Sequence, residues 1–120
     1  MILCADDDPD ILALVSMRLE HAGFEVVRVA DGEAALEVLR TRRPAVSVLD
    51  VMMPRQTGYE VLATVRADPE LQGLKVILLS ARVQQSDVAL GMEAGADAYF
   101  AKPFRSGELI EKIEELMGTE

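Results

Sequence analysis

Short apolar runs alternate with longer helix-patterned segments along this chain, and that alternation constrains the fold more than any other feature. The runs cover residues 2–5, 45–49, 76–79 and 98–101. Each is too short for a helix, and a segment with helical periodicity separates it from the next, which indicates parallel strands joined by helical crossovers. Valines around 26–29 predict a further strand. The sequence therefore predicts an α/β fold, a doubly wound parallel sheet of five strands with five helices.

Helix start and stop signals fall between the predicted strands. Asp8 precedes a proline, which makes it a favoured N-cap, and Gly23 ends the helix that follows. Thr57 and Glu60 have the spacing of a capping box, in which each side chain accepts from the other residue's backbone amide, and this helix should extend to residue 66. The remaining helices are predicted after Asp31, from about 84 to 94 and from 106 to 117.

Polar residues stand at the points where the predicted strands end. They are Asp6, Asp7, Asp50, Ser80 and Lys102. Because parallel strands joined by right-handed crossovers point the same way, residues that follow them collect along one edge of the sheet. Carboxylates are preferred ligands of Mg²⁺, and a metal together with a lysine can stabilise a phosphoryl group arriving at a carboxylate. The sequence therefore predicts a metal site that contains a phosphorylatable aspartate.

Length and charge exclude several classes of protein. The 120 residues suffice for one domain, which we expect to cover residues 1–120 without a separate output domain. The formal charge of −9 disfavours direct binding to nucleic acid or anionic lipid. Cys4 is the single cysteine and lies in a predicted strand, so we expect a buried, inert thiol. With no secretory or membrane-spanning segment in the sequence, we expect a cytoplasmic location.

Sequence motifs around these residues resemble the receiver domain of bacterial two-component response regulators. The matching segments, in family order, are ILCADDDPDI, LDVMMP, LLSA and AGADAYFAKPF. The resemblance extends from residue 2 to 117. It implies the flavodoxin-like strand order 2-1-3-4-5, with the site at the point where that order reverses.

The resemblance also implies specific roles at the acidic positions. Asp50 would be the phosphoacceptor, taking a phosphoryl group from the phosphohistidine of a sensor histidine kinase or a histidine phosphotransfer protein. Asp6 and Asp7, together with Asp50 and the backbone carbonyl of Met52, would hold Mg²⁺, for which Mn²⁺ could substitute. The domain would catalyse its own phosphorylation and dephosphorylation without being a turnover enzyme.

Further positions in the family pattern concern phosphoryl binding and the change of shape that follows. Ser80 and Lys102 would bind phosphoryl oxygens, and Ser80 and Tyr99 would act as the switch. The face formed by the fourth helix, fifth strand and fifth helix would then change its binding to an output domain or effector protein, or to a second copy of the chain. The family has a cis bond before the proline that is Pro103 here, which X-Pro bonds tolerate.

Some positions depart from the common family pattern. Thr57 stands where many relatives carry aspartate, and the capping box accounts for it. Met52 and Arg82 occupy positions that influence how long the phosphoryl group survives, so the dephosphorylation rate stays open. The fifth helix is more acidic than in relatives that dimerise through it, with glutamates at positions 108, 111, 114 and 115.

Alternative interpretations come from different classes of protein. A receiver-like scaffold would work by association alone, without phosphorylation. An aspartyl-phosphate phosphatase of the dehalogenase type would need threonine where Asp10 stands. Flavin binding on the same sheet order would be revealed by colour in the purified protein. A calcium-binding EF-hand loop is excluded, because Ile11 stands where that loop needs glycine.

Overall fold

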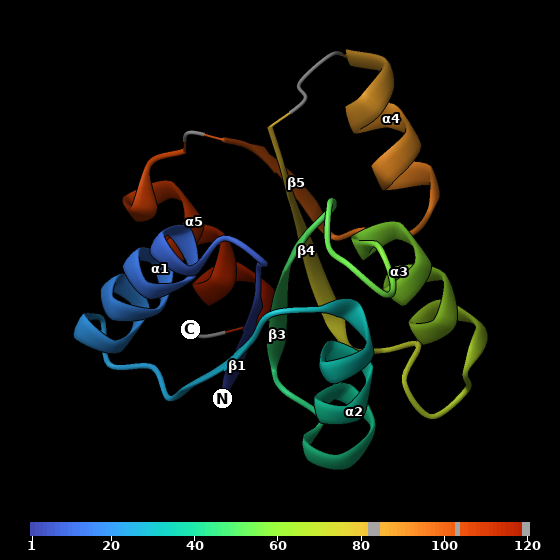
Figure 1. The fold of residues 1–120 in the computed structure, drawn as a ribbon, viewed down its shortest axis with the longest axis horizontal. Helices are drawn as coiled ribbons and strands as arrows, with labels where there is room; N and C mark the ends of the chain where they lie inside the picture. The colour runs from blue at the N-terminus through green and yellow to red at the C-terminus, as the bar shows by residue number, and fades with distance from the viewer. Residues whose placement is uncertain (82–84, 103, 119–120) are drawn as a thin grey trace.

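The computed structural model describes residues 1–81, 85–102 and 104–118, and within them the chain forms five strands and five helices (Figure 1). In chain order they are β1 (Ile2–Ala5), α1 (Pro9–His21), β2 (Val26–Val29), α2 (Gly32–Arg42), β3 (Val46–Asp50), α3 (Gly58–Ala67), β4 (Lys75–Ser80), α4 (Gln85–Glu93), β5 (Ala98–Ala101) and α5 (Ser106–Leu116). All strand pairs are parallel and the order is β2-β1-β3-β4-β5. The predicted fold class and strand order are confirmed.

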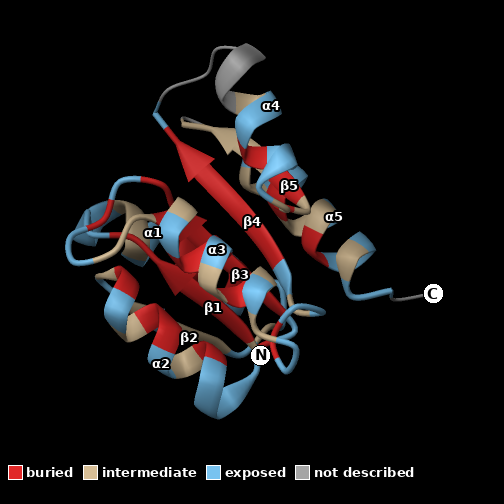
Figure 2. Cartoon of the chain, turned by 90° about the vertical axis from the view of Figure 1, so that its right-hand side faces the viewer, coloured by how far each residue is buried: buried red, intermediate tan, exposed pale blue. Residues whose placement is uncertain are grey.

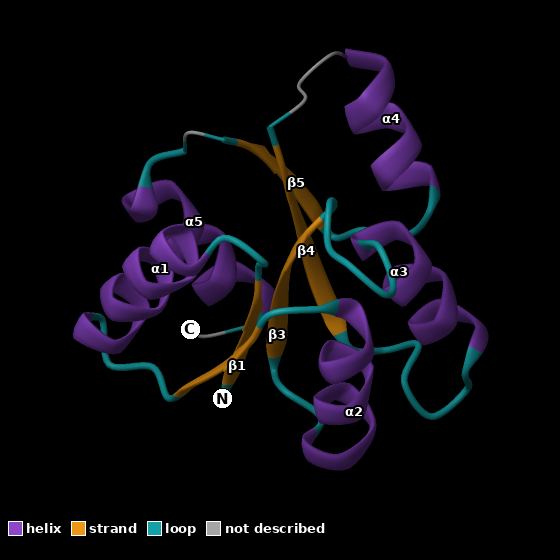
Figure 3. Ribbon diagram, in the orientation of Figure 1, coloured by secondary structure: helices purple, strands orange, loops and turns teal. Residues whose placement is uncertain are grey.

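The sheet lies between two layers of helices, with α1 and α5 on one face and α2, α3 and α4 on the other (Figures 1 and 3). Successive side chains of a strand point to opposite faces, so each central strand contributes to two cores. On β1, Leu3 packs with residues of α2 and α3, whereas Ile2 and Cys4 pack with residues of α1 and α5. β1 and β3 are therefore buried throughout, and β4 is buried except at its first residue, Lys75 (Figure 2).

Two strands end later than the sequence predicts, and both differences affect the site. β3 and β4 include Asp50 and Ser80 as their last residues. The parallel ladder continues to these positions, because Asp50 is in register with Leu79 and Ser80 with Ala101. Both polar groups are thus held by the sheet itself.

The predicted helix caps form as expected. Asp8 Oδ1 accepts hydrogen bonds from the amides of Asp10 and Ile11, at 3.0 and 3.3 Å. Thr57 and Glu60 form the reciprocal capping box at 2.8 and 3.2 Å. These caps stabilise the starts of the two helices that follow β1 and β3.

Other expectations have mixed outcomes. The predicted start of the fourth helix at residue 84 lies outside the described residues, and α4 begins at Gln85. Cys4 is buried, and burial raises the pKa of its thiol to about 12, as expected for an inert thiol. No helix in the described ranges is long and apolar enough to cross a membrane.

Arg66 connects several segments at the end of the sheet opposite the carboxyl ends of the strands. Arg66, in the last turn of α3, donates hydrogen bonds to the carbonyl oxygens of Gln72, Leu74 and Gly95 at 2.6–2.9 Å. Its guanidinium also pairs with Asp97 at 2.8 Å. The planar guanidinium therefore joins α3, the loop after it and the turn before β5.

Candidate functional site

The strand ends bring the predicted polar residues to one edge of the sheet. Asp6 and Asp7 follow β1, Asp50 and Ser80 end β3 and β4, and Lys102 follows β5. This arrangement arises because the three central strands are parallel and in register, so their carboxyl ends reach the same level. The edge lies beside the point where the chain order reverses, between β1 and β3.

Lys102 closes the site by contacting two carboxylates. Its ammonium nitrogen lies 2.8 Å from Asp6 Oδ2 and 3.2 Å from Asp50 Oδ1. The exposed fractions of the side chains are 14% for Lys102, 4% for Asp6 and 7% for Asp50. Lys102 follows a strand that lies two strands from Asp50, which is a separation of roughly 10 Å. The long lysine stem spans this distance.

Three carboxylates form a compact acidic cluster beside this lysine. Asp6, Asp7 and Asp50 each offer an oxygen, and these oxygens lie within 4.8 Å of one another. Asp6 and Asp50 are buried, whereas Asp7 is exposed. Asp6 Oδ1 also accepts from the backbone amide of Asp8 at 3.0 Å, which orients the carboxylate. Three negative charges thus face one positive charge, which leaves the site with an excess of about two negative charges.

The electrostatics of the site shift two pKa values. Burial raises the pKa of Asp50 to about 6, and the charge of Asp6 adds to this increase, while Lys102 opposes it. Burial opposes the charged form of Lys102, but the hydrogen bond to Asp6 and the charge of Asp50 outweigh it and raise the lysine pKa. The site therefore stabilises the protonated form of Lys102. It stabilises ionised Asp50 less than water would, because the nearby positive charge does not fully offset the cost of burying the carboxylate.

The donor set fits a hard divalent cation. All three nearby groups are carboxylates, the cluster carries excess negative charge, and one side of it is open at Asp7. Mg²⁺ prefers one or two carboxylates and keeps other positions for water and phosphate oxygens. The acidic cluster can therefore hold a metal ion.

Ser80 and Tyr99 take up different places relative to the cluster. Ser80 is buried at the end of β4, and its carbonyl accepts from the amide of Lys102 at 2.8 Å. Tyr99 is partly buried against the core on the α2 and α3 side of the sheet. Its ring also lies against α4, where a Cβ on Gly91 would come 2.5 Å from Tyr99 Cδ2. Tyr99 therefore touches the surface of α4 and does not belong to the acidic cluster.

The loop after Asp50 depends on Gly58, for which the sequence predicted a place in the capping box but no contact with the site. The amide of Gly58 donates to the carbonyl of Val51 at 2.9 Å, so the loop folds back onto the end of β3. A Cβ at Gly58 would lie 2.6 Å from the carbonyl oxygen of Asp50, which only glycine avoids. The Thr57-Gly58 pair in the capping box was the available signal. Met52, on this loop, is 68% exposed.

Two predicted positions cannot be compared with the structure. Arg82 and Pro103 lie outside the described residues. The expectations for phosphoryl lifetime at Arg82 and for the bond before Pro103 therefore stay predictions.

With this fold and site established, comparison with known proteins identifies the family. The profile of the response regulator receiver domain matches residues 2–114. The chain belongs to this family, whose proteins act in two-component signal transduction. Its acidic cluster and its parallel sheet of order 2-1-3-4-5 agree with that assignment.

Individual relatives support the same conclusion. The DNA-binding response regulator MtrA of Mycolicibacterium smegmatis is 38% identical over 112 residues, which cover 93% of this chain and 48% of the relative. A receiver domain of the Francisella response regulator 1452 has a TM-score of 0.92 at 32% identity, covering 98% of this chain and 95% of that chain. The chain spans about half the length of the curated relatives it matches.

A third relative bears on the metal. The receiver domain of the sensor histidine kinase PA1611 from Pseudomonas aeruginosa has a TM-score of 0.89 at 29% identity, covering 98% of this chain and 97% of that chain. Its structure contains a magnesium ion coordinated in the active site cleft.

Proposed function

We propose that Asp50 accepts a phosphoryl group from the phosphohistidine of a sensor histidine kinase or a histidine phosphotransfer protein. The observation that carries this proposal is the contact of Lys102 with both Asp6 and Asp50 inside the acidic cluster. A lysine held at this point supplies positive charge where three phosphoryl oxygens would arrive. The reaction class is phosphoryl transfer to a carboxylate.

In the proposed transfer, an ionised oxygen of Asp50 attacks phosphorus. A phosphorus–oxygen bond forms, the phosphorus–nitrogen bond to the donor imidazole breaks, and the nitrogen keeps the electron pair and takes up a proton. The raised pKa of about 6 leaves Asp50 ionised near pH 7.5, so the nucleophile is available. Lys102 and the buried hydroxyl of Ser80 would bind phosphoryl oxygens on either side.

Asp6, Asp7 and Asp50, with the backbone carbonyl of Met52, are the groups that we assign to Mg²⁺. When bound, the ion would offset the negative charge that the phosphoryl group brings to the cluster. Mn²⁺ also accepts oxygen ligands and could substitute for it. The hydrogen bond from the Asp8 amide would keep the Asp6 carboxylate in position, and Asp7 follows it directly after the end of β1.

The acyl phosphate would shift a two-state equilibrium that partners read. Ser80 would move toward the phosphoryl group and Tyr99 would turn inward, which changes the face formed by α4, β5 and α5. Tyr99 lies against Gly91 of α4, so movement of its ring would change the packing of that helix. An output domain, an effector protein or a second copy of the chain would bind the altered face. The acidic charge argues against direct contact with nucleic acid.

The domain would catalyse its own phosphorylation and dephosphorylation, without turnover of a separate substrate. A single receiver domain over residues 1–120 and a cytoplasmic location stay predictions. The phosphoryl lifetime, to which Met52 contributes, is open to measurement.

Mass spectrometry can test the assignment of Asp50. After incubation with phosphoramidate and Mg²⁺, we expect one phosphoryl adduct on the wild type, located on Asp50 and removed by hydroxylamine. Asp50→Asn should carry none, whereas Asp10→Asn, which changes an exposed aspartate in the first turn of α1, should match the wild type. An equal adduct on Asp50→Asn refutes the assignment. Partner binding that does not respond to beryllofluoride, a phosphoryl mimic, would favour the scaffold alternative.

A further inference from the structure

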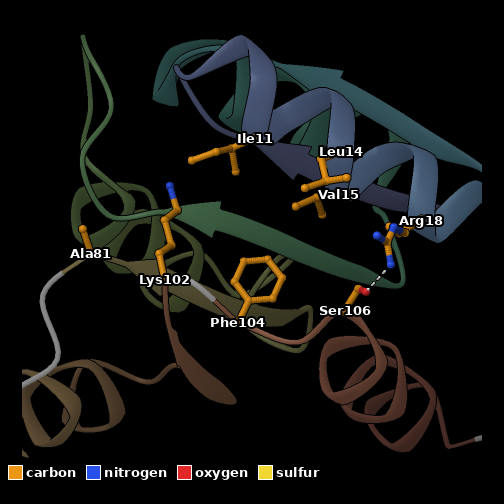
Figure 4. Close-up of a pocket in the computed structure, with 8 residues that line it drawn as sticks. All are labelled: Ile11, Leu14, Val15, Arg18, Ala81, Lys102, Phe104 and Ser106. Atoms are coloured by element: carbon orange, nitrogen blue, oxygen red, sulfur yellow. Dashed lines mark hydrogen bonds between the residues drawn. The ribbon is translucent and has the colours of Figure 1, made fainter.

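A cavity of about 450 Å³ opens between α1 and the segments that follow β4 and β5, and it extends to Ser106 at the start of α5 (Figure 4). Ile11, Leu14 and Val15 of α1 face Phe104 across it. Small-molecule sites occupy roughly 300–1,000 Å³ and are lined mainly by apolar groups with a few polar ones. The cavity matches both properties.

The walls of the cavity are held by other contacts. Phe104 stacks on Phe100 of β5, with ring centroids 6.3 Å apart and an angle of 24° between the planes. Val15 is buried in the core beneath α1, while Leu14 is 49% exposed at the rim. An apolar ligand would therefore gain contacts with side chains that are already ordered, and would cover a leucine that water now contacts.

The polar groups of the cavity are cationic. Arg18 lies at one end and Lys102 at the other (Figure 4). Within the described part of the chain, none of the residues that line the cavity is acidic, although the chain has 21 acidic residues against 12 basic ones. The described side chains that line the cavity thus include two cations and no carboxylate, on a strongly acidic protein.

Of the two cations, Arg18 is the one available to a ligand. The ammonium of Lys102 is already paired with Asp6 and Asp50. Arg18 forms no ion pair with any described residue, and its Nη1 donates to Ser106 Oγ at 3.0 Å. That hydrogen bond holds the guanidinium at the mouth of the cavity and leaves its other N–H groups free to bind an anion bidentately.

We propose that this cavity binds a small amphipathic anion, a monomeric fatty carboxylate, with its alkyl chain against Ile11, Leu14 and Phe104 and its carboxylate on Arg18. The apolar lining favours the alkyl chain of the ligand, and the guanidinium of Arg18, which has no ion-pair partner among the described residues, favours its carboxylate. Binding here does not depend on phosphorylation of Asp50, because the ligand contacts only the aliphatic stem of Lys102.

Decanoate below its micelle-forming concentration is a suitable probe, followed by backbone amide NMR of the whole chain. We expect saturable shifts centred on Ile11, Leu14, Phe104 and Ser106. Decanamide, the uncharged analogue, should bind at least tenfold more weakly, as expected for the loss of charge-assisted hydrogen bonds.

Matched variants distinguish specific binding in the cavity from a general affinity of the protein for alkyl chains. Arg18→Gln should weaken decanoate binding at least tenfold, whereas Arg40→Gln, at an exposed arginine on α2, should leave it unchanged. The binding experiment uses no phosphoryl donor, so a failure of the proposed phosphorylation of Asp50 would not affect this result. Scattered or unsaturable shifts, equal binding of decanamide, or equal affinity of Arg18→Gln would overturn the proposal, and would leave the cavity as a surface for a partner protein.

Discussion

Asp50 carries a folding penalty that a single substitution should remove. Its pKa rises from the ordinary aspartate value of 3.8 to about 6 in the folded chain, chiefly because the carboxyl is buried and next because Asp6 is charged. A shift of one pKa unit corresponds to about 1.36 kcal/mol, so ionised Asp50 destabilises the fold by up to about 3 kcal/mol. With 7% of the side chain exposed, solvent screening reduces this value little. Asparagine has the same shape without the charge.

The pH dependence of this penalty follows from the different pKa of Asp50 in the folded and the unfolded chain. Below pH 3.8 Asp50 is protonated in both states and contributes nothing to the pH dependence. Between about pH 4 and 6 the unfolded chain loses this proton while the folded chain keeps it, so the contribution of Asp50 to stability falls as pH rises. Above pH 6 the penalty is complete and constant.

We therefore expect Asp50→Asn to be more stable than the wild type by up to about 3 kcal/mol at pH 8 in the presence of a chelator, an increase in Tm of roughly 10 °C. The difference should shrink toward zero near pH 4. Urea unfolding at both pH values measures it, with Glu111→Gln on the exposed side of α5 as a control expected within about 0.5 kcal/mol of wild type. Equal stability of Asp50→Asn and wild type at pH 8 would refute the reasoning.

Three further predictions concern other parts of the molecule. Mg²⁺ should stabilise the wild type by about 2.7 kcal/mol at one hundred times its Kd, measured as a thermal shift at constant ionic strength, and Asp7→Asn should reduce that shift because it removes one carboxylate of the cluster. Arg66→Ala should destabilise the chain by about 2–4 kcal/mol in urea unfolding, because it removes the ion pair of Asp97 and the donor to several carbonyls. Gly91→Ala should lower stability by about 1–3 kcal/mol and displace the ring of Tyr99, seen in aromatic NMR, because the added methyl overlaps that ring. Gly107→Ala, where a Cβ meets nothing within 4 Å, should instead be neutral or stabilising by up to about 1 kcal/mol.

Each of these predictions has an outcome that contradicts it. A magnesium-dependent shift that Asp7→Asn leaves intact would place the ion elsewhere. An Arg66→Ala variant as stable as wild type would mean that water replaces the guanidinium without loss. If Gly91→Ala and Gly107→Ala had equal stability, the contact of α4 with Tyr99 would be looser than the structure shows.

Local patterns in the sequence were enough to predict the secondary structure. The apolar runs, the Asp8 cap and the Thr57-Glu60 box depend on neighbours within a few residues, and the structure contains a strand at each run and both caps. The predicted ends of the strands were less accurate. Whether Asp50 and Ser80 continue their strands depends on hydrogen bonds to neighbouring strands that are distant in sequence.

The sequence also indicated that acidic residues and a lysine would share one edge of the sheet, because parallel strands always bring their carboxyl ends together. Only the tertiary structure decided that Lys102 contacts Asp6 and Asp50 directly, that Gly58 must lie against the carbonyl of Asp50, and that a cavity opens beside Arg18. The physical reason is the distance along the sequence over which each interaction acts. Capping and periodicity act over one or two turns of chain, whereas burial, pKa shifts and cavities depend on the atoms that packing places around a residue.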